Sequence, residues 1–215
     1  MKKIIICSIL SIITIIPSLA LDGVGYGLRT TLSGKIYKNS SFFFEEDVRF
    51  RNDMHAEWFI TTGEINYQIL PTYLRGGAGY ISFIQYKGAK TIRHRYYLNL
   101  IGSYTLGNFK FDLRERYQGT HTKGKPGLSH ALRSRLKISY PIGKSGFAPY
   151  VYIEPFNNLK KNMHLDKVRY AVGCTYKIDK HNGVELYYRY HTFSDGYYDI
   201  INHRHNINLC YSYTF

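Results

Sequence analysis

Cysteine, proline and acidic residues are scarce in this chain, and long hydrophobic runs are confined to its start. The 215 residues include 3 Cys, 6 Pro and 1 Trp, and 15 Asp and Glu stand against 29 Lys and Arg. Three cysteines are too few for a small disulfide-stapled scaffold. Beyond Ala20 no stretch approaches the roughly 20 apolar residues of a transmembrane helix, so we expect no helical membrane span there.

The first residues have the pattern of a secretory signal peptide. Lys2 and Lys3 form a basic start, residues 4–16 are apolar, and residues 17–20 (Pro-Ser-Leu-Ala) provide a break with small residues for cleavage. We expect a signal peptide over 1–20 and a mature chain that begins at Leu21. The alternative is an uncleaved anchor, for which the apolar run is short.

Aromatic residues are abundant instead, with 22 Tyr and 12 Phe. In the segment His203–Phe215, every second residue from Ile207 onward is apolar or aromatic, which predicts a strand with one apolar face. This end resembles the closing strand of bacterial outer-membrane β-barrels, whose terminal aromatic residue is read by the barrel-assembly machinery. The resemblance implies that Tyr211, Tyr213 and Phe215 are the assembly signal.

The rest of the mature chain reads as repeated strands separated by turn residues. The expected strands are 22–36, 42–51, 58–69, 72–86, 91–106, 109–118, 131–142, 147–156, 167–178, 183–193 and 203–215. The fold class is therefore all-β: a transmembrane antiparallel up-and-down β-barrel. Because single-chain bacterial barrels have even strand numbers, we expect about 10–12 strands, with 12 slightly favoured and one segment misread.

Short and long connections alternate in the second half of the chain. Residues 107–108, 143–146 and 179–182 predict tight turns, whereas 119–130, 157–166 and 194–202 predict longer polar loops. This asymmetry is typical of short periplasmic turns and long outer loops. With no linker or change of composition, we expect a single barrel domain over 21–215.

The alternation also assigns the charged residues to the inner face. Moving the strand of Arg133 and Arg135 by one residue would expose both to hydrocarbon, at about 2–4 kcal/mol for each charge near the midplane. Glu46 and Glu115 point outward, and we expect them near a membrane interface. The inward charge network comprises Glu45, Asp47, Arg49, Arg51, Arg75, Arg93, Arg95, Asp112, Arg114, Arg116, Arg133, Arg135, Glu154, Arg169, Glu185 and Arg189.

This Arg-rich lumen has two interpretations. Arginines paired with Glu and Asp would brace the walls and fill most of the bore, giving a structural barrel with an occluded lumen. Alternatively, the excess of positive charge would form a narrow pathway that prefers anions, with a small anionic solute as its cargo.

An outer-membrane lipid-modifying hydrolase, with a Ser nucleophile and a His base at the outer rim, is the alternative function. Its candidate parts are His130 beside Ser129, His191 near Ser194, and His203 with His205. No Gly-x-Ser-x-Gly elbow or metal-ligand spacing accompanies them, so we expect no enzyme, catalytic residue, metal or cofactor.

Two further expectations concern the cysteines and the loops. Cys174 falls on the apolar face of its strand and Cys210 on the polar face of the last strand, so they should not form a disulfide. The basic loops 121–125 and 160–164 are either ordinary solvated loops or contacts to outer-membrane lipids and the phosphates of lipopolysaccharide. Nucleic acid is not an expected partner.

Several short motifs, taken in order, resemble a known family. They are 111–117 (FDLRERY), 132–136 (LRSRL), 149–156 (PYVYIEPF), 187–190 (YYRY) and the glycine-rich 76–80 (GGAGY). Together they are similar to a family of uncharacterised bacterial outer-membrane β-barrel proteins, a domain of unknown function of about this length. The resemblance implies the fold and a bacterial outer-membrane location, and it carries no catalytic residues.

Overall fold

The structure is a computed structural model that describes residues 24–161, 163–194 and 200–215. The expected signal peptide over 1–20 and the expected start at Leu21 lie outside these residues. In the described ranges, no helix is long and apolar enough to cross a membrane.

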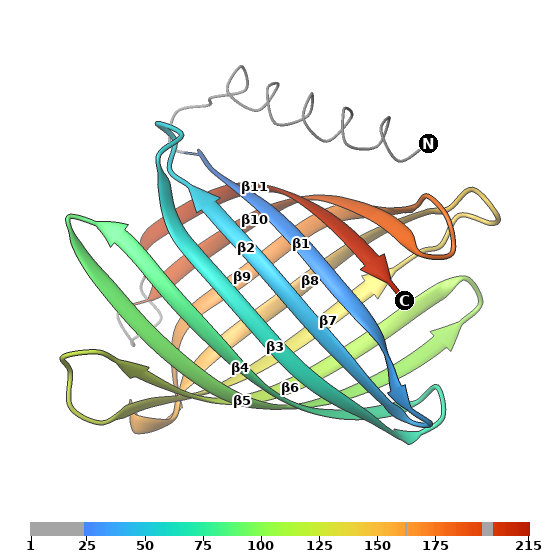
Figure 1. Ribbon diagram of the computed structural model, residues 1–215, viewed down its shortest axis with the longest axis horizontal. Helices are drawn as coiled ribbons and strands as arrows, with labels where there is room; N and C mark the ends of the chain where they lie inside the picture. The colour runs from blue at the N-terminus through green and yellow to red at the C-terminus, as the bar shows by residue number, and fades with distance from the viewer. Residues whose placement is uncertain (1–23, 162, 195–199) are drawn as a thin grey trace.

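The described residues form a closed barrel of strongly tilted strands (Figure 1). Every segment that the sequence predicts as a strand is one, and a short 3-10 turn, η2 (Leu159–Lys161), follows the eighth. The strands are β1 (Val24–Tyr37), β2 (Ser40–Phe50), β3 (Ala56–Leu70), β4 (Leu74–Lys87), β5 (Ala89–Leu106), β6 (Phe109–Thr122), β7 (Leu128–Ser139), β8 (Phe147–Asn158), β9 (His164–Lys177), β10 (Asn182–Ser194) and β11 (Ile200–Thr214).

The barrel closes between β1 and β11, which run parallel. Val24 pairs with His205 and Ser33 with Thr214, whereas all other neighbouring strands are antiparallel. Figure 1 shows the arrows of β1 and β11 pointing the same way. Eleven strands lie within the expected range of 10–12, although the slightly favoured count of twelve and the expected misread segment are not met in the described chain. Consecutive strands alternate in direction, so a first and an eleventh strand must run the same way.

The two ends of the barrel differ less than the sequence suggests. We call the end that carries residues 51–55, 88, 123–127 and 159–161 the loop end, and the opposite end the turn end. The loop predicted over 119–130 is mostly strand, because Thr120 pairs with Ser129 and His121 with Leu128. Polar side chains continue the inward positions there, so β6 and β7 extend beyond their apolar parts.

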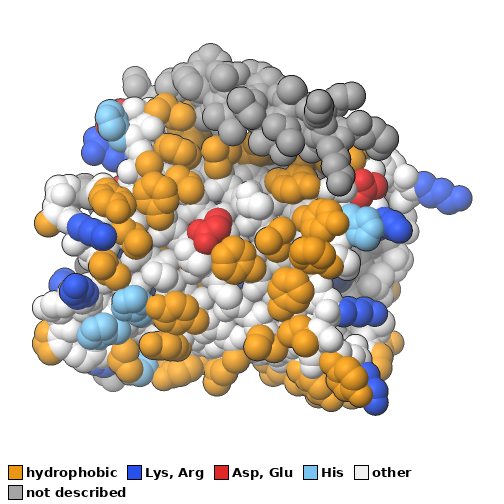
Figure 2. Space-filling view, viewed as in Figure 1, with side chains coloured by type: hydrophobic (Ala, Val, Ile, Leu, Met, Phe, Trp, Pro, Cys, Tyr) orange, Lys and Arg blue, Asp and Glu red, His pale blue; other side chains and the backbone are white. Residues whose placement is uncertain are grey.

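The outer face is apolar. Leu98 and Leu186 are 60% and 57% exposed on it. Figure 2 shows hydrophobic side chains spread across one face of the barrel, with Lys and Arg gathered toward its two ends. This distribution matches a band in contact with acyl chains.

The outward Glu46 and Glu115 do not lie at strand ends, as their expected interfacial place would require. Each sits near the middle of its strand, β2 and β6. Thr61 donates a hydrogen bond to Glu46 at 3.0 Å, and Ser134 donates one to Glu115 at 2.7 Å. A hydroxyl on the next strand therefore partly satisfies each outward carboxylate.

A small apolar patch lies inside the barrel. Ile60, Ile81 and Tyr97 form a buried cluster on β3, β4 and β5, and Trp58 and Phe83 pack against it. The patch gives one wall of the lumen an apolar surface among the charged positions.

Candidate functional site: the charged lumen

The strand register directs the predicted charge network inward. The paired rows Asp47–Ile60 and Arg116–Arg133, for example, place these side chains on the inner face. Arg51 differs, because it follows β2 at the rim and pairs with Asp53 at 2.7 Å. The inward residues of the predicted set are Glu45, Asp47, Arg49, Arg75, Arg93, Arg95, Asp112, Arg114, Arg116, Arg133, Arg135, Glu154, Arg169, Glu185 and Arg189.

Glu154 on β8 is the centre of the largest ion cluster. Its carboxylate is fully buried and accepts hydrogen bonds from Arg133 at 2.8 Å, Arg169 at 2.9 Å and Arg114. These arginines come from β7, β9 and β6. One buried carboxylate thus joins four consecutive strands, and charge-assisted bonds of this kind are the strongest that side chains form.

Asp47 on β2 is the centre of a second cluster. Arg49 donates to it at 2.6 Å, and Arg29 of β1 lies 3.4 Å from the same oxygen and 3.3 Å from Glu45. Arg29 is not in the inward set predicted from the sequence, although its place next to the apolar Leu28 in an alternating strand indicates an inward side chain.

A third cluster spans β4 without using any side chain of that strand. Glu64 of β3 accepts hydrogen bonds from Tyr97 at 2.7 Å and Asn99 at 2.9 Å, both on β5. Gly77 and Gly79 stand at the inward positions of β4 between them. A Cβ on Gly79 would overlap the Tyr97 ring. The glycines therefore let side chains from β3 and β5 meet over the backbone of β4.

These clusters run along the barrel wall and leave space within it. A cavity of about 1680 Å³ occupies the lumen. Its lining includes Lys35 and Phe215 at the turn end and Arg51 and Arg204 at the loop end. Residues from both ends of the barrel thus line one cavity, so the ion pairs lie along its wall and do not fill it.

Some lumen cations lack an acidic partner among the described residues. Arg95 on β5 donates to Thr120 at 2.9 Å and stacks on Phe83. Lys167 on β9 stands over the Phe156 ring at 4.0 Å. Neither belongs to an ion pair of the described chain, and both line the cavity. The sequence analysis did not single out Lys167.

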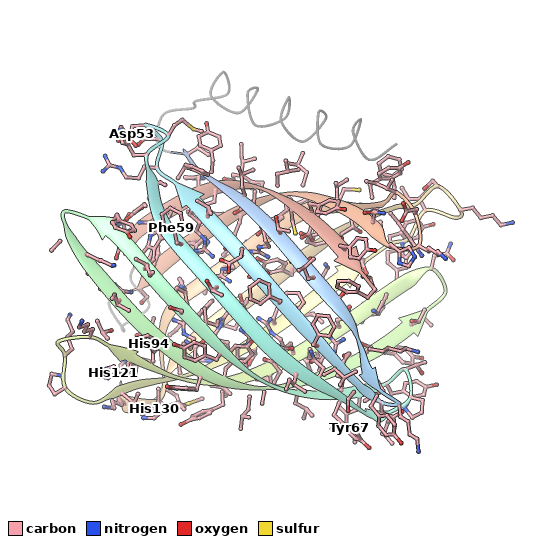
Figure 3. The ribbon with its side chains drawn as sticks, in the orientation of Figure 1. Asp53, Phe59, Tyr67, His94, His121 and His130 are labelled. Carbon is pink, nitrogen blue, oxygen red and sulfur yellow. The ribbon has the colours of Figure 1, made fainter. Side chains whose placement is uncertain are left out.

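Ser129 and His130, one of the predicted Ser–His pairs, are not brought together as a catalytic pair. Ser129 faces the lumen, whereas His130 faces outward and pairs with the Tyr117 hydroxyl at 2.8 Å. His191 is buried in the lumen. His203 and His205 share the outer face, as their spacing predicts, with ring centroids 6.3 Å apart. Figure 3 shows His94, His121 and His130 at one end of the barrel and Tyr67 at the other.

The two described cysteines do not form a disulfide. Cys174 and Cys210 are both free, and β10 lies between their strands. Among the described residues, no group of His, Cys, Asp and Glu has the geometry to hold a metal ion.

Comparisons with known proteins add a family but no activity. No curated protein matches the chain. Among solved structures it is similar to an anion-selective porin from Comamonas acidovorans, with 12% identity and a TM-score of 0.40 over 83% of this chain and 52% of the porin. The chain thus spans about half the length of that porin, and this likeness is too weak to bear on function. The family described as "Protein of unknown function (DUF2490)" matches residues 27–200, and the chain belongs to that family.

Proposed function

We propose that this protein is a bacterial outer-membrane β-barrel whose lumen is a narrow pathway that prefers anions. The observation that carries the proposal is the cavity that reaches from Lys35 at one end to Arg204 at the other. The apolar outer face and the closed sheet both support the membrane location. In lipid, a β-structure satisfies all its backbone groups only when it closes into a barrel.

The charge of the lumen supports the preference for anions. Glu154, Asp47 and Glu64 are each held by Arg side chains, and further cations such as Arg95 remain without an acidic partner in the described chain. Rings of Arg and Lys favour anions in pores because they replace part of the ion's hydration with compensating charge.

Planar-bilayer recordings of the refolded protein test this function. In a KCl gradient we expect steady openings whose reversal potential is shifted from zero toward the equilibrium potential of chloride. Arg95→Gln should move the reversal potential toward zero, since it removes a lumen charge that no acid neutralises. Lys38→Gln is the matched control, because Lys38 is exposed in the turn after β1. Cation selectivity would contradict the proposal.

A structural barrel with an occluded lumen is the second candidate. The Glu154 cluster favours it, because that cluster ties four strands together through one buried carboxylate. A folded, membrane-inserted protein that stays silent in the same recordings would favour this candidate over the pathway.

We further propose that the barrel-assembly machinery reads Tyr211, Tyr213 and Phe215. The Phe215 side chain is exposed at the turn end, and its backbone N–H donates to the Ser33 carbonyl at 2.9 Å. Phe215→Ala should lower the amount of heat-modifiable barrel in outer-membrane fractions while purified protein still refolds in vitro. Unchanged assembly in cells would remove this role.

We also propose that the basic loops contact lipopolysaccharide phosphates. Lys123, Lys125 and Lys160 lie at the loop end. Each Lys near an anionic surface contributes on the order of 1 kcal/mol. Replacing all three with Gln should weaken retention in the outer membrane of intact cells, and unchanged retention would exclude the contact.

A further inference from the structure

The wall formed by β9, β10 and β11 carries a row of basic side chains. Arg169, His191 and Arg204 are direct cross-strand neighbours in one inward-facing row. Opposed residues in such rows have Cβ atoms about 4.5–5.5 Å apart, so His191 lies directly beside both arginine side chains. Glu154 relieves only Arg169.

His191 is the most informative member of the row. Its side chain is only 5% exposed, and its Nε2 atom is buried with no hydrogen-bond partner. Buried polar atoms are nearly always paired in folded proteins, so this nitrogen is available to hydrogen-bond a group that enters the lumen. The imidazole ring stacks on Phe193, with ring centroids 6.1 Å apart, which fixes its plane.

The surroundings of His191 are cationic on both sides of the bore. Lys167 is paired with Phe193 and precedes Arg169 by two residues on the same face of β9. Arg95, on the far wall, acts electrostatically on Lys167. All of these side chains line the same cavity.

Two described acids that line the same cavity have hydrogen-bond partners of their own. Asp166 accepts a hydrogen bond from Asn158 at 2.9 Å, and Glu57 accepts one from Gln85 at 2.8 Å. Within the described chain, neither acid forms an ion pair with Lys167, His191 or Arg204. The row therefore has donors and positive charge available for an external group.

We propose that Lys167, His191 and Arg204 form a binding site for a small oxyanion at the loop end of the lumen. An ammonium group, an imidazole N–H and a planar guanidinium together offer donors to several oxygens of one phosphate-like group. Phe193 and Phe156 form an apolar floor that strengthens those contacts by excluding water. The site rests on the proposed pathway, in which it would be the place where oxyanions are bound in preference to chloride.

Calorimetric titration of the refolded protein with inorganic phosphate, in a chloride buffer, tests the site. We expect saturable binding that falls about tenfold or more in a variant with Lys167→Gln and Arg204→Gln, because each loses a charged hydrogen bond. Lys35→Gln is the matched control, since Lys35 lines the same cavity at the turn end. Trp58, the only tryptophan, lies under Arg93 in the lumen and provides an independent fluorescence signal.

The outcomes separate the site from the pathway. Absence of saturable phosphate binding by the folded protein would overturn the site, while the reversal-potential measurement would still decide the pathway. Equal weakening in Lys35→Gln would also overturn the site, because it would show a general effect of charge. Saturable binding by a protein that does not conduct would support the site and overturn the pathway.

Discussion

The Tyr97 hydroxyl donates a hydrogen bond to Glu64 at 2.7 Å although a whole strand, β4, separates the two residues in the sheet. The contact exists because Gly79 presents no side chain between them. An absence of side chain on one strand thus decides a contact between two others.

Gly79→Ala should disrupt this contact. The added Cβ would overlap the Tyr97 ring and lie 2.8 Å from the Gly63 carbonyl oxygen, so the ring or the backbone must shift. Overpacking of this kind destabilises by about 1–3 kcal/mol. Urea unfolding of the barrel in lipid vesicles measures the change. Gly63→Ala is the control, since a Cβ there meets nothing within 4 Å, and an equal loss in both variants would refute the explanation.

Glu154→Gln should destabilise the barrel more than any other single removal of a carboxylate. The change leaves Arg114, Arg133 and Arg169 close together without their shared counter-charge. Breaking a buried ion cluster in this way costs about 3–5 kcal/mol. Glu185→Gln, which removes an ion-pair contact to Lys137 at 3.9 Å and keeps an oxygen for the Tyr150 hydrogen bond, should cost about 1 kcal/mol or less. The same unfolding measurement compares them, and similar losses would contradict a central role for Glu154.

The apolar outer face predicts that the energetic cost of an added charge depends on its depth in the membrane. Leu98→Arg, in the middle of β5, should lower the free energy of unfolding in vesicles by about 2–4 kcal/mol, because it places a guanidinium among acyl chains. Leu106→Arg, at the end of the same strand and equally exposed, should cost about 0–1 kcal/mol near the interface. Equal effects at both positions would argue against insertion in a bilayer.

The turn between β9 and β10 has a predictable response to pH. The backbone N–H of His181 and the side chain and backbone N–H of Asn182 donate to Asp179, and these bonds lower the pKa of its carboxyl group from the ordinary value. The turn is therefore stabilised at neutral pH, and this stabilisation is lost as the pH falls through the lowered pKa. Carboxyl NMR titration should show this lowered pKa, and an ordinary pKa would contradict the hydrogen-bonded turn.

Every strand is predictable from the sequence, but the strand ends are not. Polar residues such as Thr120 and Ser129 have the composition of a loop, and composition alone does not show that they pair across strands. Their pairing partners are set by the register of neighbouring strands, and register depends on contacts between distant residues. For the same reason the inward position of Arg114 was predictable, whereas its bond to Glu154 was not.

The alternation of apolar and polar residues by itself determined which side chains face outward and which face the lumen, because a strand's side chains alternate at every residue whatever its neighbours are. Only the closed tertiary structure decided that β1 meets β11 in parallel, that Glu154 gathers three arginines, and that His191 stands unpaired between two cations. Those relationships join residues far apart in the chain, and closure of the sheet is what brings them to one place.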